Sequence, residues 1–413
     1  MSDVVAEVSK IGSGRSPTQR GSSAVTGNLS VPSGVELGAG VVKRQTRMPD
    51  GRELIYFDDA DTQLPPERRA DERALDPRPE TASMRRDVLT GDWVSIAAAR
   101  QNRAHLPPAD LDPLAPQTDT NPSEIPDQYD VAVFENKSPS FGPALAEATG
   151  DAPAGENAPG DLDAPGISRT FTSIGRCEVV CFSPERAGSF GTQSRSRART
   201  VIEAWADRTA ALSTLPGVKQ VFPFENRGEA IGVTLHHPHG QIYSYPYITP
   251  RTQSLLRSIE REGGDLFDRI LEFEQAGPRV VLEAEHWLAY VPFAARWPVE
   301  VHLAPRRHAA DFTELTSAER DELAGVYLRL LRGVDRVYDT PTPYIAAWHQ
   351  APVGVARDSA RLHLELTSPR RAADKLKFLA GSEAAMGAWI GDVPPEQSAE
   401  RLREAVASVE DPA

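Results

Sequence analysis

Short β-rich runs and amphipathic helices follow one another along this chain without a regular strand-helix-strand order, and this irregularity limits the fold more than any other feature. An apolar helical face over 201–215 is followed by two β-rich runs, 218–224 and 232–247, which the turn-prone residues 225–228 join as a hairpin. A second amphipathic helix covers 316–338, again with β-rich runs before and after it. A doubly wound parallel sheet requires strict alternation. The pattern therefore predicts an α+β fold in which antiparallel sheets are flanked by helices.

The order strands, helix, strands occurs twice, which predicts a duplicated unit. We place the first half at 84–262 and the second half at 263–413. Residues 1–46 are rich in Ser, Gly and Val without sustained periodicity and are predicted to be a disordered tail. Residues 47–83 contain many charged residues and prolines, which disfavour helices and sheet ladders, and are predicted to be an extended surface segment.

The composition excludes several classes of function. The 413 residues include 59 acidic and 45 basic side chains, and the net charge of −14 repels the phosphates of nucleic acids and anionic membranes. No apolar run approaches the ~20 residues of a membrane-spanning helix, and the N-terminus lacks the features of a secretion signal. The two cysteines, Cys177 and Cys181, cannot form a disulfide scaffold. We therefore expect a cytoplasmic protein that acts on small molecules, without nucleic-acid or membrane partners.

The richest motif is His-His-Pro-His-Gly-Gln at residues 236–241, which places three histidines within four positions. In an extended strand, residues two apart share a face, so His237 and His239 are predicted to point to one side. Pro238 fixes its own φ and removes a backbone donor, which stiffens the spacing between the two rings. The motif therefore predicts two imidazoles aimed together.

The residue types in this motif indicate attack on phosphorus. A neutral imidazole, with a reference pKa of about 6.5, is a competent nucleophile when one ring nitrogen donates to a fixed acceptor. Gly240 would let an oxyanion approach the backbone, and Gln241 offers an amide donor to a phosphoryl oxygen. We predict that His239 and Gln241 carry the catalysis.

Further motifs lie on both sides of this one. They are Leu-Thr-Gly-Asp-Trp at 89–93, Val-Phe-Glu-Asn-Lys at 133–137, Phe-Glu-Asn-Arg-Gly at 224–228, Glu-His-Trp-Leu-Ala at 285–289, Leu-His-Leu-Glu at 362–365 and Lys-Phe-Leu-Ala-Gly-Ser-Glu at 377–383. From about Met84 to Leu402 the chain resembles the galactose-1-phosphate uridylyltransferase family, a branch of the histidine triad superfamily. The resemblance implies two histidine-triad-like halves, the first of them catalytic, and a homodimer with its sites at the subunit interface.

The family resemblance also implies a reaction. UDP-glucose gives its uridylyl group to a histidine and releases glucose-1-phosphate, after which galactose-1-phosphate takes the group to form UDP-galactose, a step of galactose catabolism. By motif match His239 is the nucleophile, and Gln241 binds its phosphoryl oxygens. Two alternatives stay open: a nucleotidyl phosphorylase of the same superfamily, and a non-catalytic nucleotide-sugar-binding protein.

The resemblance assigns further residues to the substrates. They are Arg103, Asn226 and Thr234 near the phosphates, Asn136 at the uridine, His237 beside the nucleophile, and Lys377, Phe378 and Glu383 at the hexose phosphate. The best-known members carry a tyrosine at the position of Ser382 and a glutamine at that of Trp389. Selectivity among hexoses is therefore left open.

Metal ligands are where the chain departs from the family. The family's zinc site joins two cysteines, a histidine and the histidine that matches His237, but residues 105–126 contain no cysteine. One ligand of four cannot hold structural zinc, and no organic cofactor is implied. An iron-type site would use His349, His363 and Glu365, which otherwise form a polar network in the second half. Cys177 and Cys181 are predicted to be buried small hydrophobes.

Overall fold

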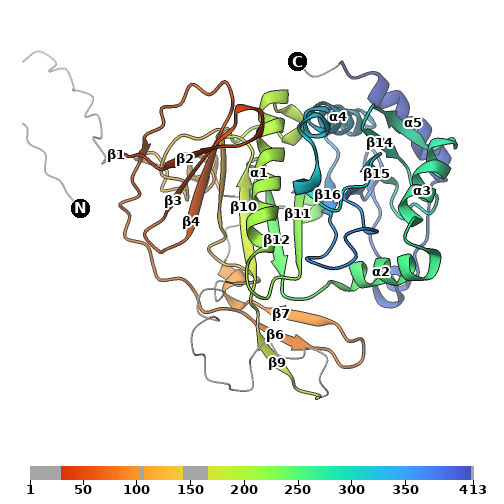
Figure 1. Ribbon diagram of the computed structural model, residues 1–413, viewed down its shortest axis with the longest axis horizontal. Coiled ribbons are helices and arrows are strands. Elements are labelled where there is room, and N and C mark those ends of the chain that lie inside the picture. Colours follow the sequence, from red (N-terminus) through yellow and green to blue (C-terminus); the bar gives the residue numbers. More distant parts are fainter. Residues whose placement is uncertain (1–28, 103–106, 143–165, 411–413) are drawn as a thin grey trace, which may run out of the picture.

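A computed structural model describes residues 29–102, 107–142 and 166–410 of the chain (Figure 1). Twelve strands of the described residues form one sheet in the order β13-β14-β15-β17-β16-β11-β12-β10-β8-β4-β3-β2, and every neighbouring pair is antiparallel. The predicted α+β class is confirmed. The strands are β2 (Ser33–Glu36), β3 (Val42–Arg47), β4 (Glu53–Asp58), β8 (Val131–Glu135), β10 (Arg176–Cys181), β11 (Gln220–Arg227), β12 (His239–Tyr245), β13 (Val280–Glu283), β14 (Trp287–Tyr290), β15 (Val299–Pro305), β16 (Tyr344–His349) and β17 (His363–Ser368).

The two halves repeat one arrangement and share the sheet. The first runs β8, β10, α1 (Arg195–Ser213), β11, β12, and the second runs β14, β15, α4 (Ser317–Arg336), β16, β17. They meet where β11 pairs with β16, so the strand order is mirrored about this junction. The predicted antiparallel pairing is confirmed, and the strands of both halves join in one continuous sheet. Pairing at the junction leaves neither half with an unpaired edge strand there.

Helices α1 and α4 cover one face of the sheet, as α1 does in the view of Figure 1. Between the helices and the sheet lies an aromatic core in which Trp205 of α1 and Tyr327 of α4 pack against Trp348 of β16, with ring centroids 5.9 and 5.6 Å apart. The capping box of Thr316 and Glu319 begins α4 as the sequence indicates. The remaining α-helices of the described residues are α2 (Pro250–Glu262), α3 (Leu266–Gln275) and α5 (Pro395–Ala407).

The ordered part of the chain begins well before the first predicted half. The prediction of a disordered tail is wrong for residues 29–46, which contribute β2 and most of β3, and residues 1–28 lie outside the described residues. The prediction of an extended surface segment is wrong at β4, because the apolar run Leu-Ile-Tyr-Phe at 54–57 is fully buried. Pairing with β8 and burial of these four side chains outweigh the weak periodicity of the flanking sequence.

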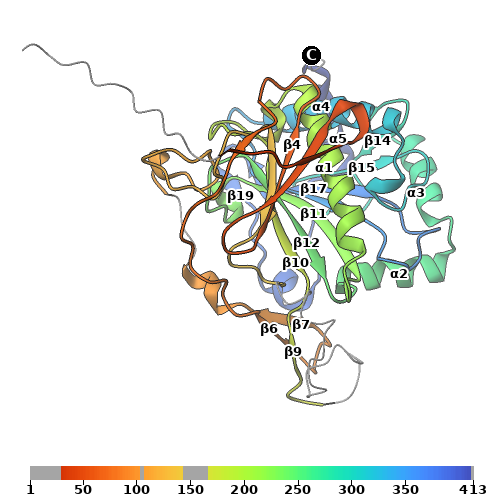
Figure 2. The same ribbon diagram turned by 60° about the vertical axis from the view of Figure 1, so that its left-hand side comes forward.

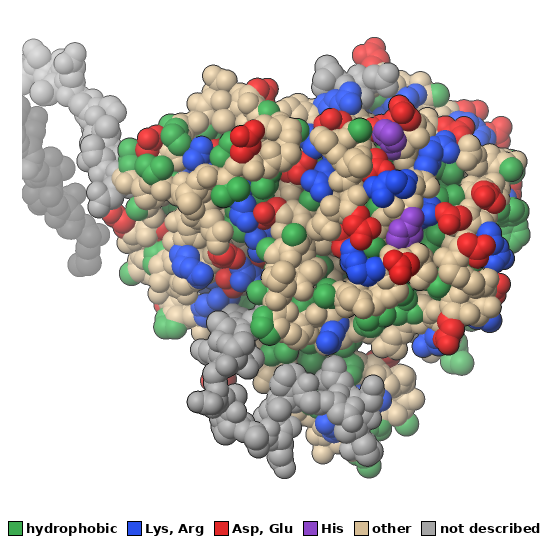
Figure 3. Space-filling model, viewed as in Figure 1, with side chains coloured by type: hydrophobic (Ala, Val, Ile, Leu, Met, Phe, Trp, Pro, Cys, Tyr) green, Lys and Arg blue, Asp and Glu red, His purple; other side chains and the backbone are tan. Residues whose placement is uncertain are grey.

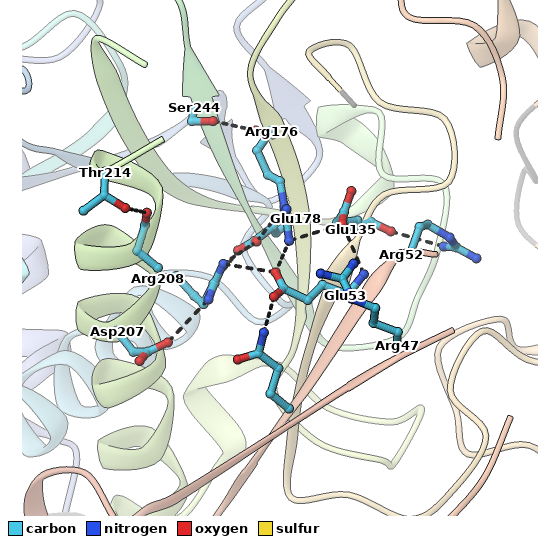
Figure 4. Close-up of polar contacts among 12 residues, drawn as sticks. Arg47, Arg52, Glu53, Glu135, Arg176, Glu178, Asp207, Arg208, Thr214 and Ser244 are labelled. Atoms are coloured by element: carbon cyan, nitrogen blue, oxygen red, sulfur yellow. Dashed lines mark hydrogen bonds and ion pairs between the residues drawn. The ribbon is translucent and has the colours of Figure 1, made fainter. Parts of the chain in front are cut away.

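A network of ion pairs fixes β4 to the rest of the first half (Figure 4). Glu53 of β4 pairs with Arg176 of β10 and lies 3.8 Å from Arg208 of α1. Arg208 in turn donates two hydrogen bonds, of 2.9 and 2.8 Å, to the carboxylate of Glu178. Burial raises the pKa of Glu178, but the charges of Arg208 and Arg176 outweigh it and hold the pKa below its usual range. The N-terminal strands are therefore held by paired charges as well as by apolar burial.

A small sheet projects from the first half. It consists of β6 (Ser83–Arg86), β7 (Trp93–Ile96) and β9 (Thr170–Thr172), and it extends below the main body in Figures 1 and 2. Two two-stranded sheets complete the described strands, β1 (Leu29–Ser30) with β5 (Arg68–Arg69) and β18 (Arg370–Ala372) with β19 (Lys375–Leu376).

The surface shown in Figure 3 mixes acidic and basic side chains instead of gathering the basic ones into one patch. A nucleic-acid interface would need such a basic patch. Among the helices of the described residues, none combines the length and the apolar character that a bilayer crossing requires.

Candidate active site

The site lies on the face of the sheet opposite α1 and α4. Alternate residues of β12 point to opposite faces, and Ile242 belongs to the apolar core beneath the helices. His239 and Gln241 therefore point to the other face, where both line the same two cavities. Gly240 faces the core, where an added Cβ would lie 2.8 Å from the ring of Phe182, so this glycine is required for packing and not for the approach of an oxyanion.

The ring of His239 is oriented by its own backbone. Its Nδ1 lies 2.7 Å from the carbonyl oxygen of His237. A carbonyl oxygen only accepts, so Nδ1 carries the proton and donates, and the lone pair of the neutral ring resides on Nε2. This is the tautomer that a nucleophilic imidazole needs.

His237 lies on the same side of the sheet as His239, because its ring contacts Tyr129, which packs in one cluster with Cys181, the register partner of His239. The two rings are not aimed together at the cavities, however, since only His239 lines them. The ring of His237 is fully buried, with Nδ1 2.9 Å from Asp112 Oδ2 and Nε2 2.7 Å from the carbonyl oxygen of Ser183, and it lines neither cavity. The structure thus places His237 next to His239 but away from the two cavities.

The polar cluster around His237 is closed on every side. The Tyr129 hydroxyl lies 3.1 Å from His237 Nε2 and 2.7 Å from the carbonyl oxygen of Leu114. Burial raises the pKa of Asp112, but the hydrogen bond and charge of His237 outweigh it and lower the pKa below its ordinary value. An oxygen atom faces each ring nitrogen of His237, the carboxylate of Asp112 at Nδ1 and the carbonyl oxygen of Ser183 at Nε2.

Two adjoining cavities open at His239. The larger, of about 600 Å³, is within the range of small-molecule sites and is also lined by Asn136. The smaller, of about 210 Å³, is lined by Asn226 and Arg100. Thr234 lines both, as do His239 and Gln241. The structure therefore brings His239, Gln241, Asn136, Asn226 and Thr234 together, as the sequence predicts, while Arg103 lies outside the described residues.

The polar groups of these cavities are arranged to meet a ligand. The side-chain oxygen of Gln241 is buried and has no hydrogen-bond partner among the described residues. Asn136 is held in place, because its side-chain oxygen accepts from the backbone of Ser138 at 2.9 Å. Arg100, four residues after the strand β7, supplies a guanidinium to the smaller cavity. Amide donors beside a cation suit phosphoryl oxygens.

Sequence reasoning missed one wall of the larger cavity. Asp76, Pro77 and Pro79 line it, although the sequence predicts an extended surface segment there. Arg78, between the two prolines, pairs with Glu135 of β8 and holds the segment against the sheet. An arginine between two prolines is the one signal in the sequence that could have indicated docking of this segment.

The residues predicted at the hexose phosphate lie away from the two cavities at His239. Lys377 and Phe378 line a third cavity, and neither they nor Glu383 lines the cavities at His239. Lys377 is buried, donates to the backbone oxygen of Arg296 at 2.9 Å, and lies 3.7 Å from Glu383. Within one chain, the two predicted parts of the site are not brought together.

The residues offered for a metal do not fit one. Glu365 pairs with the guanidinium of Arg251, and its carboxylate oxygens lie 3.5 Å from His349 Nε2 and 3.7 Å from His363 Nε2. The two imidazoles stack with centroids 5.1 Å apart. Among the described residues, no group of three or more His, Cys, Asp and Glu side chains is placed to hold an ion. The iron-type interpretation is therefore wrong, and the alternative, a polar network, is what the structure shows.

The residues nearest to the family's zinc site do not fit zinc either. Both ring nitrogens of His237 are occupied by oxygen partners, at 2.9 Å from Asp112 and 2.7 Å from the carbonyl oxygen of Ser183, so neither is turned toward a metal. Cys177 and Cys181 are buried among hydrophobic side chains, as predicted. Burial raises the pKa of Cys177 to about 11 and that of Cys181 further, which disfavours the thiolates that a metal binds.

Comparison with known proteins gives this geometry a family context. The family model for the N-terminal domain of galactose-1-phosphate uridyl transferase matches residues 70–249, and the model for its C-terminal domain matches residues 257–411. The galactose-1-phosphate uridylyltransferase of Streptomyces lividans is 45% identical over 88% of this chain and 97% of its own. That of Thermotoga maritima is 34% identical over 78% and 98%. A solved uridylyltransferase structure is similar with a TM-score of 0.68 at 28% identity, over 79% of this chain and 100% of that one.

Proposed function

Since this chain belongs to the galactose-1-phosphate uridylyltransferase family and is a nucleotidyltransferase, we propose that it moves the uridylyl group of UDP-glucose to galactose-1-phosphate through a covalent histidine intermediate, as a step of galactose catabolism. The observation that carries the covalent route is the orientation of His239. Its Nδ1 is committed to the carbonyl oxygen of His237 at 2.7 Å, which leaves the lone pair on Nε2.

The first step is a displacement at the α-phosphorus of UDP-glucose. The lone pair of His239 Nε2 forms the N–P bond, and the bond from phosphorus to the bridging oxygen breaks with its electron pair going to glucose-1-phosphate. In the second step a phosphate oxygen of galactose-1-phosphate attacks the same phosphorus, and the P–N electron pair returns to Nε2. No net proton transfer is needed, because the leaving group and the acceptor are both phosphate anions. Catalysis then consists of positioning and charge neutralisation.

The cavities suggest how the substrate lies. We place the nucleoside in the larger cavity beside Asn136, and the phosphates in the smaller one, where Arg100, Asn226 and Gln241 offer donors. Lys377 and Phe378 lie away from His239 in the same chain, and Phe378 is 77% exposed. We therefore propose that the hexose end of the site is completed by these residues of a second copy in a homodimer.

Intact mass measurement tests the covalent route. After mixing with UDP-glucose alone, the protein should gain the mass of one uridylyl group, and the gain should be acid-labile. His239→Ala should show no gain. His363→Ala is the matched control, because His363 has the same hydrogen bond to a backbone carbonyl in the second half and should leave the adduct intact. A binding protein would show no adduct in any of the three.

Competition between acceptors separates the transferase from a phosphorylase. Uridylylated protein mixed with galactose-1-phosphate should form UDP-galactose in preference to the UDP that attack by inorganic phosphate would give. Preferential loss of the uridylyl group to inorganic phosphate would instead identify a nucleotidyl phosphorylase.

Mixing two inactive variants tests whether two copies share a site. Lys377→Ala and His239→Ala variants should partly restore activity when combined as heterodimers.

We also propose that the reaction needs neither zinc nor an organic cofactor. The support is chemical, because both ring nitrogens of His237 are occupied by oxygen partners and Arg251 supplies the cation beside Glu365. Turnover should persist after dialysis against a chelator. Elemental analysis that found one zinc per active chain would refute this.

A further inference from the structure

We propose that Asp112 is a positioning residue for the nucleophile, acting through His237 in the place that a metal ion would otherwise take. The proposal rests on the proposed function, since it assigns a task to the group behind His239. Neither Asp112 nor Tyr129 belongs to one of the sequence motifs, and both come from a loop region far from β12 in the chain.

A continuous line of hydrogen bonds leads from Asp112 to the reacting ring. Asp112 Oδ2 lies 2.9 Å from His237 Nδ1, and the backbone carbonyl oxygen of His237 lies 2.7 Å from His239 Nδ1. The ring of His237 therefore fixes the residue whose carbonyl sets the tautomer and direction of His239. Between the two histidines, the carbonyl oxygen of Pro238 accepts from the backbone of Phe182 at 3.1 Å, which stops the peptide from turning.

Asp112 is itself held rigidly. Its other carboxylate oxygen accepts from the backbone N–H of Leu114 at 3.0 Å, and its backbone oxygen accepts from the side chain of Asn121 at 2.8 Å. On the far side of the His237 ring, the Tyr129 hydroxyl lies 3.1 Å from Nε2. Asp112 is 3% exposed and His237 is 2% exposed. A buried, fully hydrogen-bonded group of this kind holds one geometry, which is what a positioning device requires.

The second half contains the same arrangement built from different residues. There Asp268 pairs with the buried guanidinium of Arg361, and the backbone carbonyl oxygen of Arg361 lies 2.8 Å from His363 Nδ1. In both halves a carboxylate holds the side chain two residues before a strand histidine, and that residue's carbonyl orients the histidine. The repeat shows that the arrangement can be built from a histidine or from an arginine at this position.

Asp112→Asn tests the proposal. The amide keeps the volume but removes the charge and weakens the hold on His237, so the single-turnover rate of uridylylation by UDP-glucose should fall about 10- to 100-fold. Affinity for UDP, measured by calorimetry, should change less than about threefold, because Asp112 lines neither cavity. The matched control is Asp268→Asn, which removes the equivalent charge in the second half and should leave the uridylylation rate unchanged.

A spectroscopic readout separates positioning from folding. In full-length protein labelled with 15N histidine, the His239 signal should report protonation at Nδ1, and Asp112→Asn should show a mixture of tautomers. If Asp112→Asn fails to fold, Tyr129→Phe, which removes one hydroxyl from the same cluster, should give the same mixture and a smaller loss of rate. An unchanged tautomer and rate in whichever variant folds would overturn the proposal. Absence of any adduct in the unaltered protein, with the tautomer still responding to Asp112→Asn, would instead refute the proposed function alone.

Discussion

The two halves of the sheet carry equivalent histidines in different surroundings. His239 of β12 and His363 of β17 each donate from Nδ1 to the carbonyl oxygen two residues earlier, at 2.7 and 2.8 Å. They differ at the next residue on the same face, which is Gln241 in the first half and Glu365 in the second. His239 lines cavities of about 600 and 210 Å³, whereas His363 lines one of about 240 Å³ that also contains Arg251 and Glu365, and Phe267 of α3 packs against its ring with centroids 5.2 Å apart.

The comparison shows that the hydrogen bond from histidine Nδ1 to a backbone carbonyl does not by itself make a site for phosphate. In the second half the carboxylate of Glu365 already satisfies Arg251, His349 and His363, which are the groups that could meet an anion. In the first half a neutral amide stands at the same place, so the donors stay available for a substrate. Charge at this one position therefore distinguishes the surroundings of His239 from those of His363.

The largest effect is expected when a carboxylate like that of Glu365 is placed at the equivalent position of the first half, residue 241. Gln241→Glu places a carboxylate among the phosphates and gives His239 an internal partner, so kcat/KM for UDP-glucose should fall by about 10²-fold or more. Steady-state assays over a range of salt concentration would measure it, with Gln241→Asn as the uncharged control. A loss of less than threefold would show that the difference between the halves lies elsewhere.

The next effect concerns the stability of the first half, which depends on the buried ion pair of Glu178 and Arg208. Glu178→Ala leaves Arg208 buried without its carboxylate and should lower the free energy of unfolding by about 3–5 kcal/mol. The double change of Glu178 and Arg208 to methionine should restore most of this loss. Urea denaturation would measure both, and Glu260→Ala on the exposed side of α2 serves as control. Equal stability of Glu178→Ala and this control would contradict the account.

The junction of the halves predicts a pH dependence. Burial raises the pKa of Glu225 to about 7, although Arg227 and the hydroxyl of Tyr344, 3.1 Å away, lower it. The folded state then holds a proton that the unfolded state loses near the ordinary glutamate pKa of 4.5, so the contribution of Glu225 to stability is fully present below pH 4.5 and is lost as the pH rises toward 7. The slope should approach about 1.4 kcal/mol per pH unit. Glu225→Gln should flatten the curve in denaturation measured from pH 5 to 8, and an unchanged curve would contradict the shift.

The smallest effect is expected from the converse change in the second half. Glu365→Gln removes the partner of Arg251, which is half exposed, so the loss of stability should be about 1 kcal/mol or less. Activity should stay within about twofold, since this network is remote from His239. Isothermal calorimetry with inorganic phosphate would show whether the released cations now bind an anion. A large loss of turnover would mean that the second half contributes to the chemistry.

Much of the fold follows from the sequence, because α1, α4 and the strands around them have strong periodicity and clear caps. The strands β2 to β4 could not be predicted from their own residues. Their stability comes from pairing with β8 and from ion pairs to Arg176 and Arg208, which are contacts between segments far apart in the chain.

The candidate site, too, could be predicted only in part. The motif predicts which residues surround the cavity, because chemistry restricts residue types at His239, Gln241 and Asn136. It does not show that the ring of His237 is enclosed away from the cavities, and it gives no sign of Asp112, whose contact with His237 comes from a loop. Lys377 and Phe378 are placed by resemblance alone, and within one chain they line a different cavity from His239.

The most direct test is to map the uridylyl group on the intact protein. After reaction with UDP-glucose and an alkaline quench, peptide mass spectrometry should find one uridylyl group per chain on His239, and NMR of labelled histidine should place it on Nε2. Modification of His363, or turnover that requires both sugar phosphates to be bound before any product leaves, would contradict the account.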